Sequence, residues 1–143
     1  KRAKEYAESW GIYMQLTNIL RDVAEDIERD RIYLPIEDLN RYGISEEDLK
    51  NGKDILKHPG WKPFVKEYIK RADKYRERGM KLFPLLDKSS RYSPAAMTTF
   101  YHSIMKKIEK NHGDVFSERT QLSKTEKIGL AAYIYVRFRF FAL

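Results

Sequence analysis

Hydrophobic residues recur every three to four positions along most of the chain, which is the spacing of an amphipathic α-helix. The pattern predicts long helices over residues 3–31, 63–83 and 94–111, and a last helix that follows Ser123 and reaches the C-terminus. Two shorter helices are expected over residues 36–42 and between Ser45 and Gly52. No run of alternating hydrophobic and polar residues indicates a strand. The sequence therefore predicts an all-α domain with short connections.

Proline, glycine and capping residues mark the expected ends of these helices. Pro35 must end the first helix, because the residue before a proline avoids helical geometry. Pro63 and Pro94 are expected at the first helical position of the two central helices. Ser45 with Asp48, and Ser123 with Glu126, have the spacing of capping boxes. Residues 53–60 and 87–93 are expected to form a loop and a turn.

The first predicted helix has two different faces. Its apolar stripe, with Ile12 at the edge, consists of Leu16, Ile19, Leu20, Val23 and Ile27. The other face carries amides, carboxylates and an arginine at successive turns: Gln15, Asn18, Asp22, Asp26 and Arg29. One side of the helix therefore belongs to the core, and the other requires a separate explanation.

Two interpretations of the polar face remain open from spacing alone. Such a face is often only solvated, with nearby arginines compensating the repulsion between Asp22 and Asp26. However, like charges one turn apart are mildly destabilising, and aspartate is a poor residue inside a helix. Neutral and anionic oxygen ligands on one face suit a hard cation such as Mg²⁺, which is usually shared with substrate phosphates.

Composition narrows the possible partners. The 143 residues carry a formal net charge of +7, which favours anionic partners such as phosphorylated small molecules, acidic lipid or nucleic acid. The basic residues are scattered, which disfavours a nucleic-acid binder. With no cysteine and three separated histidines, disulfides are excluded and a zinc site is disfavoured. No signal peptide or membrane-spanning run is evident, so a cytoplasmic protein, soluble or peripheral to a membrane, is expected.

Other candidate residues follow in the second half of the chain. Tyr101 either belongs to the core or directs its hydroxyl at a phosphate or a developing charge. Arg119, Lys124 and Lys127 lie near the start of the last helix, where cations are unfavourable unless an anion is also bound. The aromatic and basic stretch 133–141 is expected to form a buried helix, with an interfacial membrane anchor as the alternative.

Two groups of residues together resemble a known family. The first is Gln15-Leu-Thr-Asn18-Ile-Leu-Arg21-Asp22-Val-Ala-Glu25-Asp26, followed by Arg31-Ile-Tyr33-Leu-Pro35. The second is Tyr101-x-x-Ile104-x-x-x-Ile108, then Asp114-Val-Phe116-x-x-Arg119 and Lys124-x-x-Lys127. Their order and spacing resemble the squalene/phytoene synthase family of trans-isoprenyl diphosphate synthases over nearly all of residues 1–143.

The resemblance implies the isoprenoid synthase fold and a Mg²⁺-dependent head-to-head condensation of two prenyl diphosphates. Loss of diphosphate would give an allylic cation, which the second prenyl double bond attacks to form a cyclopropylcarbinyl diphosphate. By this resemblance Asn18, Asp22 and Asp26 would ligate the metal. Tyr101 and Arg21 would be catalytic, and the substrate site would contain Gln15, Arg21, Tyr101 and Arg119.

The sequence also departs from that family. Members carry a first aspartate-rich motif on an earlier helix, whereas residues 1–14 contain only Glu5 and Glu8 as acids. The chain therefore corresponds to the C-terminal half of such an enzyme, and we expect it to be inactive alone. A family member that has become a non-catalytic assembly or binding protein is the alternative.

The resemblance leaves several properties open. The donor can be farnesyl or geranylgeranyl diphosphate, and the product squalene, dehydrosqualene, phytoene or the cyclopropyl diphosphate. Use of NADPH and the oligomeric state are equally undetermined by the sequence.

Overall fold

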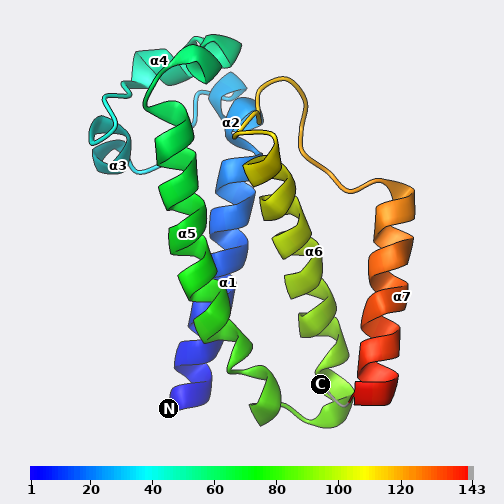
Figure 1. The fold of residues 1–143 in the computed structure, drawn as a ribbon. Coiled ribbons are helices and arrows are strands. Elements are labelled where there is room, and N and C mark those ends of the chain that lie inside the picture. Colours follow the sequence, from blue (N-terminus) through cyan, green and yellow to red (C-terminus); the bar gives the residue numbers. More distant parts are fainter. Residues whose placement is uncertain (142–143) are drawn as a thin grey trace.

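In the computed structural model, which describes residues 1–141 and the side chains of residues 1–137, four long helices form the body of the molecule (Figure 1). They are α1 (Arg2–Arg21), α5 (Trp61–Met80), α6 (Tyr92–Lys110) and α7 (Lys124–Phe141). Helix α1 packs against both α5 and α6, and α7 packs against α6. The all-α prediction is confirmed, because the described residues contain no strand.

Short helices cover one end of this bundle, and two more lie in the connection between α5 and α6 at its other end (Figure 1). Those at the top of Figure 1 are α2 (Val23–Glu28), α3 (Ile36–Asn40), α4 (Glu46–Lys50) and the 3₁₀ helix η1 (Gly52–Lys57). Two further 3₁₀ turns, η2 (Phe83–Leu85) and η3 (Lys88–Ser90), join α5 to α6. The expected loop 53–60 and turn 87–93 therefore each contain a 3₁₀ helix.

The first helix is not continuous as predicted. Its geometry is interrupted at Asp22 (φ −101°, ψ 10°), although the Asp22 and Asp26 N–H groups still donate to the carbonyls of Asn18 and Asp22. Helix α2 then ends at Glu28 rather than residue 31, because Asp30 adopts a left-handed conformation (φ 56°). Pro35 thus follows the helix end by several residues.

The two central helices begin earlier than predicted. Helix α5 starts at Trp61 and α6 at Tyr92, so Pro63 and Pro94 are each at the third helical position. A proline is tolerated there because the first four N–H groups of a helix have no intrahelical acceptor. Helix α5 ends at Met80 and η2 follows. Both predicted capping boxes are present, at Ser45–Asp48 and at Ser123–Glu126.

The core is broader than the predicted apolar stripe of the first helix. Leu20 and Val23 are buried, while Leu16, Ile19 and Ile27 are only partly covered. Ser9, Tyr13 and Thr17 are buried on α1 as well, because this helix lies between two neighbours, α5 and α6. The Thr17 hydroxyl donates to the Tyr13 carbonyl, which satisfies it inside the core.

The last helix is less buried than expected. Ile134 is buried, whereas Tyr133, Tyr135 and Val136 are about half exposed. Arg137 is exposed as well, and the side chains of residues 138–141 lie outside the described residues. In the part of the chain that is described, no helix is both long and apolar enough to cross a membrane.

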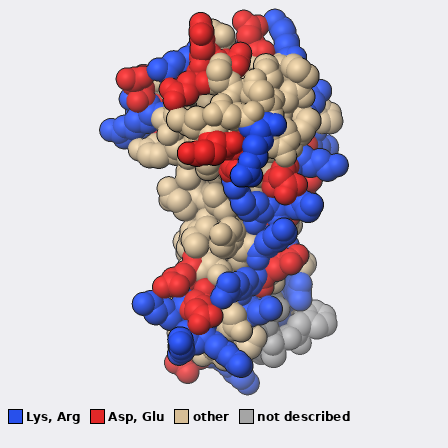
Figure 2. All heavy atoms as spheres, turned by 90° about the vertical axis from the view of Figure 1, so that its left-hand side faces the viewer, with Lys and Arg blue, Asp and Glu red and all other residues tan. Residues whose placement is uncertain are grey.

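Charge is distributed as the sequence indicates. On the face shown in Figure 2, basic and acidic side chains are interspersed rather than gathered into a patch of one sign.

Candidate anion and metal site

The end of α1 and the loop between α6 and α7 meet at one carboxylate. Arg119 lies 97 residues after Asp22, and its Nε donates to Asp22 Oδ1 at 3.0 Å. Arg119 Nε also lies 3.2 Å from Glu25 Oε1. Arg21 binds the same Asp22 carboxylate through Nε, at 2.7 Å, and through its terminal nitrogen. Two predicted basic residues and one predicted metal ligand are therefore brought together.

The loop is held so that Arg119 reaches this position. Asp114 Oδ1 accepts the backbone N–H groups of Phe116 and Ser117. The Trp61 indole donates to the Gly113 carbonyl at 3.0 Å, and its ring contacts Phe116 edge-on. Gly113 has φ 81°, and a Cβ there would lie 2.8 Å from a Val65 methyl group. Only glycine fits this turn, so the loop entry is fixed by α5.

The far end of the loop is fixed by α6. Lys107 donates to the Gln121 carbonyl at 3.0 Å and to Glu126 Oε2 at 2.9 Å. Glu126 also accepts the Ser123 N–H, which completes the cap of α7. The sequence motif contained Arg119, but the positioning roles of Trp61 and Lys107 come from contacts distant in sequence and were not predicted.

A cavity of about 400 Å³ adjoins the two arginines. We call it the upper cavity, and its lining is Arg21, Phe100, Ile104, Arg119, Thr120, Gln121, Leu122 and Lys127. Three of these residues are cations and none is acidic, while Phe100, Ile104 and Leu122 provide an apolar wall. The arrangement suits a ligand that has an anionic group attached to an apolar body.

The electrostatics of Asp22 depend on these arginines. Its side chain is 19% exposed, and this burial by itself raises the pKa of the carboxyl. The hydrogen bonds from Arg21 and Arg119 outweigh that effect and hold the pKa below its usual value. The same bond to Asp22 raises the pKa of Arg21, to which the nearby Tyr101 contributes further. Both charges are therefore fixed at neutral pH.

The other predicted site residues lie around rather than inside the upper cavity. Gln15 is exposed, and Asn18 and Tyr101 are partly buried. Asp26 lies in a small crevice beside Arg31 and Leu49. None of these four residues belongs to the cavity lining. The polar face is nevertheless not simply solvated, because Asn18 and Asp22 are largely covered.

One atom on this face has an unused capacity to bind a cation. Asn18 Oδ1 is buried and accepts no hydrogen bond. It lies one helical turn before Asp22, so an amide oxygen and a carboxylate follow each other along α1, which is a donor set that Mg²⁺ accepts. Among the described residues no group of three or more His, Asp or Glu side chains could hold a metal. The face thus offers an amide oxygen and a carboxylate one helical turn apart.

Comparison with known proteins identifies the class to which this fold and site belong. A solved dehydrosqualene synthase in complex with a ligand superimposes with a TM-score of 0.80 and 29% identity, over 94% of this chain and 46% of that chain. The chain therefore has the isoprenoid synthase fold, as predicted, and matches about half of that structure.

Sequence comparison then gives the family. The squalene/phytoene synthase family model matches residues 1–126. A chloroplastic phytoene synthase from an Oncidium hybrid cultivar is 40% identical over 129 residues, covering 90% of this chain and 31% of that protein. A 15-cis-phytoene synthase from Synechocystis is 39% identical over 125 residues, covering 87% and 36%. The chain belongs to the squalene/phytoene synthase family and spans about a third of these relatives.

Proposed function

We propose that this chain forms one wall of the active site of a Mg²⁺-dependent enzyme that condenses two prenyl diphosphates head to head, giving a phytoene- or squalene-type product. The observation that carries the proposal is the meeting of Arg119 and Arg21 at Asp22, beside a cavity lined by three cations and an apolar wall. The names of the relatives and of the solved neighbour support the substrate class.

The metal would be held by Asn18, Asp22 and Asp26. The unpartnered Asn18 oxygen and the ionised Asp22 carboxylate fit this role. Bound Mg²⁺ would neutralise diphosphate charge and so assist its departure. Arg21 and Arg119 both bind the Asp22 carboxylate in the structure. We infer that the guanidinium groups turn to the diphosphate when it binds, which frees the carboxylate for the metal.

The cavity residues have separate roles in this proposal. When the carbon–oxygen bond of the first donor breaks, its electron pair leaves with the diphosphate, and Arg21, Arg119 and Lys127 stabilise that negative charge. Phe100, Ile104 and Leu122 exclude water from the allylic cation that remains. Tyr101, near Arg21, would provide its hydroxyl at the edge of the diphosphate site, and Gln15 would face the substrate from α1.

Binding of inorganic diphosphate with Mg²⁺ to the purified chain tests the site directly. Arg119→Gln should weaken this binding about tenfold, which is the loss expected for one charge-assisted hydrogen bond. Arg41→Gln provides the matched control, since Arg41 is an exposed arginine paired with Asp38 elsewhere. Equal affinities for the wild type and the Arg119→Gln variant would refute the anion site.

Turnover tests the reaction. In a full-length enzyme containing this sequence, Asp22→Ala should abolish Mg²⁺-dependent release of diphosphate from farnesyl or geranylgeranyl diphosphate without unfolding the protein. We expect the 143-residue chain alone to release none, because the facing aspartate-rich motif is not among its residues. Release of diphosphate by the chain alone would contradict this expectation, and an inactive wild-type parent would favour a non-catalytic binding protein.

A further inference from the structure

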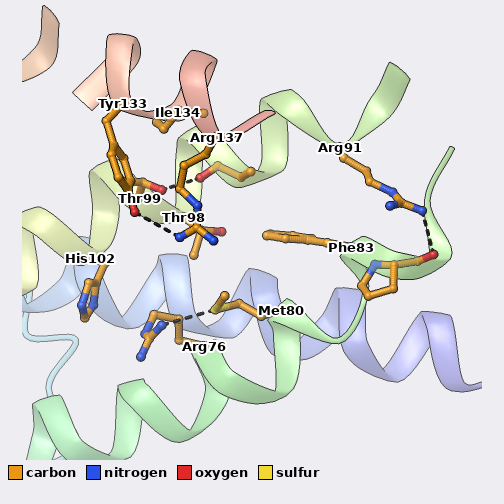
Figure 3. A pocket seen from close by; sticks show the side chains of 12 residues that line it. Arg76, Met80, Phe83, Arg91, Thr98, Thr99, His102, Tyr133, Ile134 and Arg137 are labelled. Carbon is orange, nitrogen blue, oxygen red and sulfur yellow. Dashed lines mark hydrogen bonds between the residues drawn. The ribbon is translucent and has the colours of Figure 1, made fainter. Parts of the chain in front are cut away.

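A second cavity, of about 440 Å³, lies between α5, α6 and α7 (Figure 3), toward the end of the bundle where η2 and η3 join α5 to α6. We call it the lower cavity. Its apolar lining consists of Met80, Phe83, Pro84, Ala95 and Ile134. This volume is in the range of small-molecule pockets in proteins. It shares no residue with the upper cavity.

The polar part of the lower cavity is positively charged. Arg137 projects from α7 toward Arg76 on α5, with the cavity between them (Figure 3). Arg76 is paired with Asp73, whereas among the described residues Arg137 donates to the Tyr133 hydroxyl, at 3.0 Å, and pairs with no carboxylate. No Asp or Glu belongs to the described lining. Asp73 neutralises Arg76, and no carboxylate of the described residues pairs with Arg137, so these two guanidinium groups leave an excess positive charge at this cavity.

His102 adds an unused hydrogen-bonding atom to the same region. Its Nδ1 is buried and has no hydrogen-bond partner, since Asp73 Oδ1 is 3.7 Å away. A buried polar atom without a partner is costly, and a ligand that bonds to it removes the cost. His102 belongs to the cavity lining, beside Arg76 (Figure 3).

We propose that the lower cavity binds an anionic amphiphile, a single apolar chain that ends in a carboxylate or a phosphate. The chain would lie along Met80, Phe83 and Ile134, and the head group would bind between Arg76 and Arg137. The planar guanidinium group matches carboxylate and phosphate oxygens with two parallel hydrogen bonds. An uncharged lipid would leave the excess positive charge unpaired, so it fits the site less well. This site is independent of the prenyl diphosphate reaction proposed above.

Calorimetric titration of the 143-residue chain with dodecanoate tests the location of the site. Ala95→Phe places a ring in the cavity and should abolish binding. Ala132→Phe, on an exposed position of α7 outside the lining, should bind as the wild type does. Circular dichroism checks that both variants keep the wild-type helix content. Unchanged binding in the Ala95→Phe variant, or a wild-type Kd weaker than about 1 mM, would overturn the proposal.

Charge variants test the role of the head group. Arg137→Gln should weaken dodecanoate binding about tenfold, while Lys124→Gln, an exposed charge at the other end of α7, should not change it. Dodecanol should bind wild type more weakly than dodecanoate does. Equal binding of the alcohol and the acid would show that the arginines do not recognise the head group, and would refute the anionic class.

The apolar chain of such a ligand can be an acyl chain or an isoprenoid chain. Titration with farnesyl phosphate, in parallel with dodecanoate, distinguishes these two classes of ligand. If Ala95→Phe weakens binding of farnesyl phosphate as well as dodecanoate, the cavity accepts prenyl chains. Loss of dodecanoate binding alone identifies a site for acyl chains. If the variant weakens neither, neither ligand occupies the lower cavity and the proposal fails.

Discussion

Asp22 shows how one residue joins the two ends of the sequence. The carboxylate is mostly covered, and an ion in that position requires partners that repay its lost hydration. Arg21 provides one partner from the same helix, and Arg119 provides the other from a loop that Gly113 and Asp114 position. The helix is also interrupted at this residue, so the ion pairs lie at the junction between α1 and α2.

His102 makes the stability of the chain depend on pH. Burial, followed by the nearby positive charge of Arg76, lowers its pKa from the ordinary 6.5. The unfolded chain therefore binds the proton more readily than the folded protein, so the free energy of unfolding falls as the pH drops below about 6.5. Urea unfolding between pH 7 and pH 5 measures the slope, and His102→Gln should reduce it. His112→Gln, in an exposed turn, should keep the wild-type slope.

At the scale of the elements, close contact between helices decides which positions must be small. Gly79 on α5 lies against the backbone of Trp10 on α1, where a Cβ would be 2.7 Å from the Trp10 Cα. Trp10 in turn donates its indole N–H to Thr98 on α6 at 2.7 Å. A single region of α1 therefore fixes the positions of both neighbouring helices.

Two glycine substitutions separate this packing from helix propensity. Gly79→Ala should lower the free energy of unfolding by about 1–3 kcal/mol, because the new methyl group meets backbone that cannot move aside locally. Gly11→Ala, next to Trp10 but with nothing within 4 Å of the new Cβ, should raise it by up to about 1 kcal/mol. Urea unfolding measures both. Equal effects of the two substitutions would show that α1 and α5 are not in close contact.

The ion pair between Lys107 on α6 and Glu126 on α7 should be lost at low pH. Hydrogen bonds from Lys107 and then from the Ser123 backbone lower the pKa of Glu126 to about 2. Its contribution is therefore complete above its ordinary pKa of 4.5 and is lost as the pH falls toward 2. NMR chemical shifts at the start of α7 should follow this titration. Glu126→Gln should already show the loosened helix start at neutral pH, whereas Glu118→Gln, in the preceding loop, should not.

For the whole molecule, the proposed function predicts that some exposed positions become covered in a longer enzyme. Ala7 and Met97 are exposed on α1 and α6, the helices that carry Asn18 and Tyr101. If these helices form one wall of a cavity, the facing wall should cover both positions.

Because the chain contains no cysteine, introduced cysteines report this cover directly. Ala7→Cys and Met97→Cys should react with a maleimide in the 143-residue chain and be protected in a full-length enzyme. Lys57→Cys, at a side chain that is 83% exposed beyond the bundle, should react in both. Mass spectrometry locates the label. Equal reactivity of Met97→Cys in the two proteins would contradict the two-walled cavity.

Local patterns predicted the elements, and contacts between distant residues corrected them. The all-α fold class and both capping boxes depend on the spacing of residues a few positions apart, so they could be predicted from the sequence alone. The starts of α5 and α6 were placed too late because a proline near a helix start marks the first turn rather than its first residue. The burial of Tyr13 could not be predicted, because it depends on α1 packing against both α5 and α6. The spacing of hydrophobic residues along α1 does not indicate how many helices pack against it.

Some features of the candidate site could likewise be predicted from the sequence, and others depend on the tertiary structure. The line Gln15, Asn18, Asp22 and Asp26 follows from helical periodicity alone, whereas Arg119 entered the candidate substrate site only through the family resemblance. The contact of Arg119 with Asp22 and the upper cavity arise only when the loop after α6 folds back onto α1. The burial of Asn18 Oδ1 and the lower cavity likewise exist only in the folded chain. Periodicity acts over one or two helical turns, whereas burial and charge pairing depend on how whole helices pack, and only the tertiary structure decides that.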